Sequence, residues 1–206
     1  TDKDTVKVVE DVLANEINAE IVKSINESGG KAIGLSGNKN TLLSASKLKI
    51  EVKDSDSNIE KLVDIGFVGQ PTEVNTNFIK KQINDGNIPV IAPLGIDEEG
   101  NSYNINADTA AGFIAGELEA SKLLLLTDVP GILDQDKKLI SSLTLDDASK
   151  IIDEDFIVGG MKPKILTCVE AMKKGVNKTT ILDGRIPHSV VLELFTEHGI
   201  GTQIYS

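Results

Sequence analysis

The chain has 206 residues, of which 40% are hydrophobic and only 3% aromatic, and it contains no Trp. Its interior must therefore consist of Ile, Leu, Val and Ala, as in sheets covered by helices, which predicts an α/β fold of one domain or two tightly joined halves. The net charge of -11 at pH 7 excludes a broad nucleic-acid-binding surface, because such a surface needs clustered Lys and Arg. A single cysteine, Cys168, excludes an internal disulfide and is expected to be a buried small hydrophobe.

The sequence shows no sign of a membrane or secretory segment. No apolar run approaches the roughly 20 residues that cross a bilayer, and the start TDKDTVKVVEDV lacks the basic flank and apolar stretch of a signal peptide. We therefore expect a cytoplasmic protein, or a stromal one in an organelle, with no membrane partner. Because the chain begins with Thr1 instead of Met, we expect a processed or truncated amino terminus.

The first half of the chain predicts helices and strands in alternation. Apolar residues recur at helical spacing over 2–28 and stop at a pair of glycines, which indicates one long helix or two consecutive ones. Strands are expected at 31–37, 48–52 and 65–74, with a solvated turn over 53–58. A helix closed by Gly86 should follow over 76–87, and then a buried strand over 88–95 that ends in a loop.

The second half continues the alternation. A helix rich in small residues is expected over 107–120, and four leucines at 123–126 predict a central parallel strand covered on both faces. The remaining expected elements are helices over 144–153, 161–174 and 189–197 and strands over 179–183 and 201–205. This order favours a mainly parallel sheet with helices on both sides, whose functional residues lie in loops at the carboxyl ends of the strands.

The first candidate site is the segment NINAD, which contains Asn104, Asn106 and Asp108 at the start of the expected helix over 107–120. Backbone amides and the helix dipole can hold an anion there. From spacing alone, it is at least as plausible that Asn106 or Asp108 only caps the helix. The density of amide and carboxylate side chains favours a site.

The second candidate site is LLLLTDVPGIL, in which Thr127, Asp128 and Gly131 follow a buried strand. Nucleotides bind at such strand ends, although Asp-Val-Pro-Gly is also an ordinary turn sequence.

The third candidate site is GGMKPK, where Gly159 and Gly160 allow close backbone approach and Lys162 and Lys164 flank a helix amino terminus. Lysines at the positive end of a helix dipole favour a bound phosphate, and the alternative is two solvated surface lysines.

The fourth candidate group lies near the carboxyl terminus and contains His188, Glu197, Gly199 and Gly201. The residues alone indicate only a helix with glycine-rich flanks. The Walker A, GxGxxG, HExxH and Gly-x-Ser-x-Gly signatures are absent, and with two histidines a His-rich metal site is not expected. Charge neutralisation by lysines and backbone amides is the chemistry that remains.

Six motifs occur in the order typical of N-acetylglutamate kinases: DIGFVGQPTEVN, IPVIAPLGID, YNINADTAAGFIAGEL, LLLLTDVPGIL, GGMKPK and ILDGR with HSVVLELFTEHGIGT. The chain resembles this family over essentially its whole length. The resemblance implies the amino acid kinase fold, a three-layer sandwich with a mainly parallel central sheet, here incomplete at the amino terminus. It also implies that 1–106 belongs to the lobe that binds the acyl amino acid and 107–206 to the ATP-binding lobe.

The resemblance also implies a reaction and its residues. The reaction is ATP-dependent phosphorylation of the side-chain carboxylate of N-acetyl-L-glutamate in arginine biosynthesis, with Mg²⁺ bound through the nucleotide and no protein metal ligand. Asn104 and Asn106 match substrate-binding residues, whereas Asp108 and Lys164 match catalytic ones. The residues that match the nucleotide pocket are Thr127, Asp128, Gly131, Gly160 and Met161.

The carboxyl-terminal segment resembles the arginine-sensitive branch of the family. Feedback inhibition by L-arginine is thereby implied, with His188, Glu197, Gly199 and Gly201 as candidate ligands. A homo-oligomer and a PII-type regulator are further implied partners. The family's first catalytic lysine, its two glycine-rich turns and its substrate-binding arginine match positions upstream of Thr1, so the 206-residue chain alone is expected to be inactive.

Two alternatives remain open at this point. The chain could be another amino acid kinase, for aspartate, glutamate or carbamate, or a fragment that binds arginine or a nucleotide without catalysis. The loop GLSGNKN at 34–40 departs from the Gly-Lys-Asp-Gly common in the family, which leaves the role of this loop open.

Overall fold

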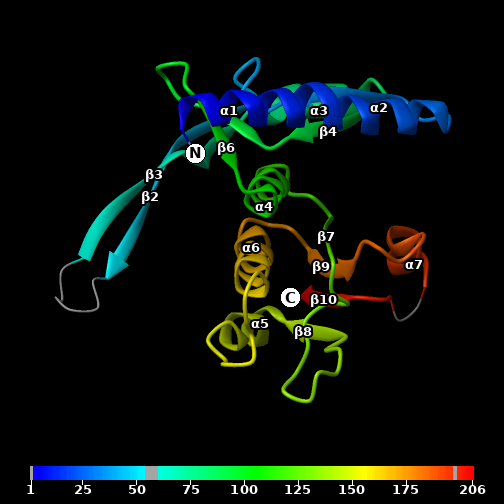
Figure 1. Ribbon diagram of the computed structural model, residues 1–206. Helices are drawn as coiled ribbons and strands as arrows, with labels where there is room; N and C mark the ends of the chain where they lie inside the picture. The colour runs from blue at the N-terminus through cyan, green and yellow to red at the C-terminus, as the bar shows by residue number, and fades with distance from the viewer. Residues whose placement is uncertain (1, 54–59, 197–198) are drawn as a thin grey trace. The chain divides into compact units, whose positions relative to one another are not determined.

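A computed structural model describes residues 2–53, 60–196 and 199–206, which form two compact units, Thr1–Ala110 and Ala111–Ser206 (Figure 1). Each unit has its own helices and strands. We describe the units separately.

The first unit begins with one continuous helix, which is one of the two arrangements predicted for 2–28. It consists of α1 (Lys3–Glu10), a π-helical segment η1 (Asp11–Ile17) and α2 (Asn18–Glu27). Asp2 caps its start, because one carboxylate oxygen accepts hydrogen bonds from the amides of Asp4 and Thr5. Gly29, with φ +88°, ends the helix, since only glycine adopts that conformation without strain.

The strands of the first unit form two groups. β1 (Ala32–Ser36) and β4 (Ile88–Ala92) pair in parallel, and the buried Asn18 ties α2 to them by donating to the carbonyl of Val90 at 2.8 Å. A closed barrel contains β2 (Leu43–Lys53), β3 (Glu60–Val74), β5 (Leu94–Ile96) and β6 (Ser102–Ile105). Figure 1 shows β2 and β3 extending together as a long ribbon, and α3 (Thr76–Asn84) connects β3 to β4.

The prediction of one buried strand over 88–95 is wrong. The strand breaks at Pro93, which has no N–H group to continue a ladder, and the chain passes from the pairing of β4 with β1 to that of β5 with β6. Ile88 at its start is 48% exposed. The turn expected over 53–58 lies almost entirely outside the described residues.

The second unit contains a four-stranded sheet in the order β7-β9-β10-β8. α4 (Ala107–Glu117) leads into β7 (Lys122–Thr127), and β8 (Ser142–Thr144) is followed by α5 (Leu145–Ile151) and α6 (Met161–Lys173). β9 (Lys178–Asp183), α7 (Ser189–Phe195) and β10 (Thr202–Tyr205) complete the unit. β7 runs parallel to β9 and β8 parallel to β10, whereas β9 and β10 are antiparallel. The α/β class is confirmed.

The prediction that the four leucines form a central strand is also wrong. Among the described strands, β7 pairs only with β9 and lies at the edge of its sheet. Leu123 and Leu125 are buried, but Leu126 is 49% exposed. A run of leucines is compatible both with a strand buried on one face and with a strand buried on both faces, so the sequence pattern could not distinguish an edge strand from a central one.

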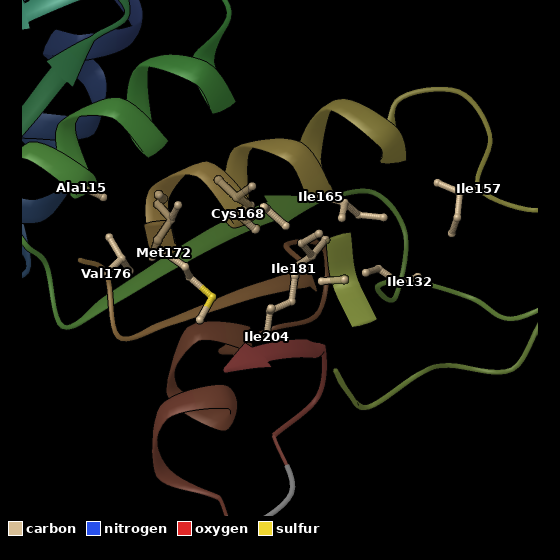
Figure 2. Close-up of a cluster of buried hydrophobic side chains, with 14 residues drawn as sticks. Ala115, Ile132, Ile157, Ile165, Cys168, Met172, Val176, Ile181 and Ile204 are labelled. Carbon is tan, nitrogen blue, oxygen red and sulfur yellow. The ribbon is translucent and has the colours of Figure 1, made fainter. Parts of the chain in front are cut away.

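The core of the second unit lies between α6 and the sheet (Figure 2). α6 buries Ile165, Cys168 and Met172 along one face, at the spacing of three and four residues that a helix requires. Ile181 of β9 and Ile204 of β10 pack in the same cluster. The prediction that Cys168 is buried is confirmed.

Candidate functional site

A cavity of about 250 Å³ in the second unit brings together six of the predicted site residues. Lys164 and all five predicted nucleotide-binding residues line it: Thr127, Asp128, Gly131, Gly160 and Met161. These residues come from two segments that are separated in sequence, the loop after β7 and the start of α6. The sequence motifs are therefore neighbours in space.

The ends of β7 and β9 position one wall of the cavity. The two strands are parallel and finish in register, with Thr127 opposite Asp183, and the amide of Gly184 donates to the carbonyl of Thr127 at 2.8 Å. The hydroxyl of Thr127 donates to the Asp128 carboxylate at 3.3 Å. This is the carboxyl edge of parallel strands, where α/β proteins bind ligands.

The start of α6 forms the opposite wall. Gly159, with φ +60°, turns the chain into Gly160, which provides no side-chain cap. The amide of Met161, the first residue of α6, donates to the carbonyl of Val158 at 3.3 Å, and Pro163 has no N–H group, so the cationic group that this wall presents to the cavity is the Lys164 side chain. Lys164 is half-buried and lines the cavity, whereas Lys162 is exposed. Of the two lysines, only Lys164 lines the proposed anion site.

Apolar side chains make up most of the remaining wall. Val129, Leu133, Phe156, Ile157 and Val158 line it together with Met161. Flat, largely apolar ligands bind to such surfaces, and a few polar groups set their orientation. The cavity therefore combines largely apolar walls with one cationic side chain, that of Lys164.

Arg185 is a cation near this edge that the sequence analysis missed. Its backbone amide and guanidinium donate three hydrogen bonds to Asp183, at 2.9, 3.0 and 2.8 Å. The hydrogen bonds from Arg185 lower the pKa of Asp183 to about 2. The pKa of Arg185 is raised, first by those bonds and also by the negative charge of Asp128. A D-G-R turn directly after a strand was the available signal.

The predicted substrate residues lie in the first unit around the start of α4. Asn104 is a half-buried residue of β6, opposite Leu94 and Val68. The side-chain oxygen of Asn106 accepts a hydrogen bond from the amide of Thr109 at 3.1 Å, so Asn106 does cap α4. Asp108 is half-buried in the first turn of that helix. Substrate and catalytic roles for these residues stay predictions.

A second, polar pocket of about 240 Å³ lies beside β10 in the second unit. Its lining includes Gly199 and Gly201 from the predicted arginine site, and also Glu193, which the sequence analysis did not select. The other lining residues are Ser141, Ser142, Thr196 and Gln203. His188 is not among them: it is an exposed residue with φ +61° that precedes α7. Glu197 lies outside the described residues.

Glu193 is a buried carboxylate with well-defined partners. Thr180 donates to its Oε1 at 3.1 Å, and the amides of Ile200 and Gly201 donate to its Oε2 at 2.8 and 3.3 Å. Gly199 has φ +59°, and a Cβ there would lie 2.5 Å from the carboxylate. The pocket is therefore built around this negative charge. The signal in the sequence was a single glutamate within the otherwise largely apolar segment SVVLELF.

Residues 1–183 match the model of the amino acid kinase family. The chain belongs to this family. The acetylglutamate kinase of Rhodospirillum centenum is 53% identical over 204 residues, and that of Brucella canis is 54% identical over 204 residues. These matches cover 99% of this chain and 67% and 69% of the relatives, so the chain spans about two thirds of their length.

Solved structures agree on the fold. N-acetylglutamate synthase from Neisseria gonorrhoeae, complexed with coenzyme A and N-acetyl-glutamate, matches with a TM-score of 0.83 and 27% identity over all of this chain and 45% of that one. The same enzyme complexed with coenzyme A and L-arginine matches with a TM-score of 0.71 and 29% identity over 91% of this chain and 43% of that one. Giardia carbamate kinase, at 15% identity, matches with a TM-score of 0.65 over 97% of this chain and 71% of that one. The predicted amino acid kinase fold is confirmed.

Two features are absent from the described residues. No helix in that part of the chain is long and apolar enough to span a membrane. No group of three His, Cys, Asp or Glu side chains there is arranged to hold a metal ion.

Proposed function

We propose that the cavity of the second unit binds ATP and that Lys164 and Asp108 act in transfer of its γ-phosphoryl group to the side-chain carboxylate of N-acetyl-L-glutamate. The relatives support ATP-dependent phosphorylation of N-acetylglutamate in arginine biosynthesis over the other amino acid kinase activities. The single observation that carries the site assignment is that five predicted nucleotide residues and Lys164 line one cavity.

The reaction needs alignment and charge neutralisation more than proton transfer. The acceptor carboxylate is ionised at pH 7, so one of its oxygens attacks the γ-phosphorus without a general base. The bond from that phosphorus to the bridging oxygen breaks, its electrons leave with ADP, and the product is an acyl phosphate. Lys164 would stabilise the negative charge on the phosphoryl oxygens as it moves.

Magnesium fits this site only as a nucleotide-bound ion. Asp128 is the one carboxylate among the cavity residues, and Mg²⁺ commonly takes one or two carboxylates together with substrate phosphates and water. When bound, the ion would neutralise charge on the nucleotide phosphates. Asp128 would then face the metal or the ribose hydroxyls.

The test is an acyl-phosphate assay with hydroxylamine on this chain and on a form extended to the full length of the relatives. We expect N-acetylglutamate-dependent ADP release and hydroxamate formation from the extended form, with aspartate, glutamate and carbamate as poor substitutes. The 206-residue chain is expected to bind ATP without turnover. An extended form that releases no ADP with N-acetylglutamate would contradict the proposal.

We also propose that the polar pocket binds the guanidinium group of L-arginine as an inhibitor. A buried carboxylate flanked by hydroxyl and amide side chains offers the charge and the acceptors that a guanidinium needs. Calorimetry with L-arginine should show binding, whereas citrulline, which is neutral, should bind at least tenfold more weakly. Equal binding of the two would contradict a charge-based site.

Assembly as a homo-oligomer and binding of a PII-type regulator stay predictions.

A further inference from the structure

The cavity and the polar pocket meet at the beginning of β10. Gly201 lines the polar pocket, and the next residue, Thr202, is the first of β10 and is completely buried. Gly131 lines the cavity and lies against Thr202. Gly201, which lines the polar pocket, is therefore bonded directly to Thr202, which contacts Gly131 in the wall of the cavity.

Thr202 holds the loop that leaves β7. Its Oγ1 accepts a hydrogen bond from the backbone amide of Ile132 at 2.8 Å, across 70 residues of sequence. A Cβ added to Gly131 would lie 2.6 Å from the same oxygen, so the backbone of the loop passes directly over the hydroxyl. Because the interior is close-packed, loss of this hydrogen bond should shift the loop and with it the cavity wall.

Glu193 holds the backbone just before Thr202. Its Oε2 accepts from the amides of Ile200 and Gly201, and Gly201 is confined because a Cβ there would lie 2.4 Å from the carbonyl of Ile181. A cation in the polar pocket competes with those two amides for the carboxylate. An occupant that weakens those two hydrogen bonds would loosen the backbone next to Thr202.

We propose that Thr202 is a positioning residue of the nucleotide cavity and that it couples nucleotide affinity to occupancy of the pocket around Glu193. The inference rests on the proposed function, in which the cavity takes ATP and the pocket takes a guanidinium. Differential binding at one site changes affinity at the other by the same factor in both directions. The coupling runs through two hydrogen bonds, from the amide of Gly201 to the Glu193 carboxylate and from the amide of Ile132 to the hydroxyl of Thr202, the residue next to Gly201.

The first arm of the test is equilibrium binding of ATP to the 206-residue chain and its variants. Thr202→Val keeps the shape of the side chain but removes the acceptor, and it should weaken ATP binding about tenfold, while Thr202→Ser should stay within about twofold of the unchanged chain. Thr179→Val is the matched control, since Thr179 is equally buried on β9, has its hydroxyl against the sulfur of Met172 and is not a cavity residue. It should leave ATP affinity unchanged.

The second arm repeats the ATP titrations with saturating L-arginine. Arginine should weaken ATP binding at least threefold in the unchanged chain and in Thr179→Val, and the shift should largely disappear in Thr202→Val. Amide hydrogen exchange gives an independent reading, because Thr202→Val should speed exchange at Ile132 at least tenfold while the melting midpoint stays close to that of Thr179→Val.

The outcomes separate the two proposals. If the unchanged chain binds no ATP, the proposed nucleotide site fails and this inference fails with it. If the unchanged chain binds ATP but Thr202→Val binds it equally well, or keeps the full arginine shift, the inference alone is overturned.

Discussion

The two pockets of the second unit have opposite chemistry although one sheet supports both. The cavity at the ends of β7 and β9 has mostly apolar walls with Lys164 and Asp128 as its charged groups. The pocket beside β10 is lined by small and polar residues around the buried carboxylate of Glu193. The first environment suits a flat base and the second a planar cation, which are the ligands proposed for the two pockets.

The difference also shows how an acidic protein can bind a polyanion. The net charge of -11 opposes ATP at long range, but screening removes most of that effect beyond about 8 Å at physiological salt. What matters is the charge within the cavity and at its edge. Lys164 and the neighbouring Arg185 would supply that positive potential locally.

The largest effect should come from removing the cavity's lysine. In a form extended to the full length of the relatives, Lys164→Ala should lower turnover by about 10² to 10³, because its charge acts mainly on the transition state. ATP affinity should fall much less. Steady-state kinetics with N-acetylglutamate and ATP would measure both.

Lys162→Ala provides the control for that experiment. Lys162 lies two residues away but is exposed and outside the cavity, and its loss should change turnover less than threefold. Equal losses of turnover and ATP affinity in Lys164→Ala would contradict a role in the transition state.

A smaller effect is expected in the polar pocket. Glu193→Gln keeps the size of the side chain but removes its charge, and it should weaken L-arginine binding about 10- to 100-fold while ATP affinity without arginine changes little. Glu170→Gln on the exposed face of α6 is the matched control. Calorimetry measures both, and retention of arginine affinity in Glu193→Gln would place the guanidinium elsewhere.

Much of the site was predictable because its residues follow rules of position. Thr127 ends a strand, Asp128 directly follows it, and Gly160 directly precedes a helix, so parallel β–α architecture brings them to one edge. Helical structure over 2–28 was predictable for a similar reason, since its apolar period and glycine stop are local signals, whereas these signals did not distinguish one helix from two consecutive ones.

What could not be predicted depends on contacts distant in sequence. Glu193 and Thr180 meet only when α7 packs on β9, and no local pattern of α7 indicates which side chain points inward. His188 was a candidate only through the family resemblance, yet it is exposed and does not line the pocket. The position of β7 at the sheet edge likewise depends on which strands pair.

The apolar wall of the cavity, which distinguishes it from the polar pocket, can be tested for its contribution to ATP binding. Val158 is 71% exposed in the described structure yet lines the cavity, so Val158→Ala should weaken ATP binding about two- to fivefold through lost apolar contact. Stability should change by less than about 0.5 kcal/mol, as for other exposed positions. Val191→Ala, at a 53% exposed position on α7, should alter neither quantity. Unchanged ATP affinity in Val158→Ala would argue that the base does not contact this wall.

The smallest expected effect is a pH dependence of the folding stability that comes from the ion pair of Asp183 and Arg185. The pKa of Asp183 is about 2 in the folded chain because Arg185 donates hydrogen bonds to it, whereas an ordinary aspartate has a pKa of 3.8. Since the folded value is depressed, the ionised carboxylate stabilises the fold fully above about pH 4, and this contribution is lost as the pH falls through about 2.

The variant Asp183→Asn lacks the stabilisation that the ionised carboxylate of Asp183 provides. Urea unfolding between pH 2 and 7 should therefore show a stability gap between the unchanged chain and Asp183→Asn that is constant above about pH 4 and closes toward pH 2. Arg185→Gln removes the donor instead of the acceptor and should give the same closing gap. A gap that stays constant down to pH 2 in both variants would show that the pair contributes through packing and not through its charges.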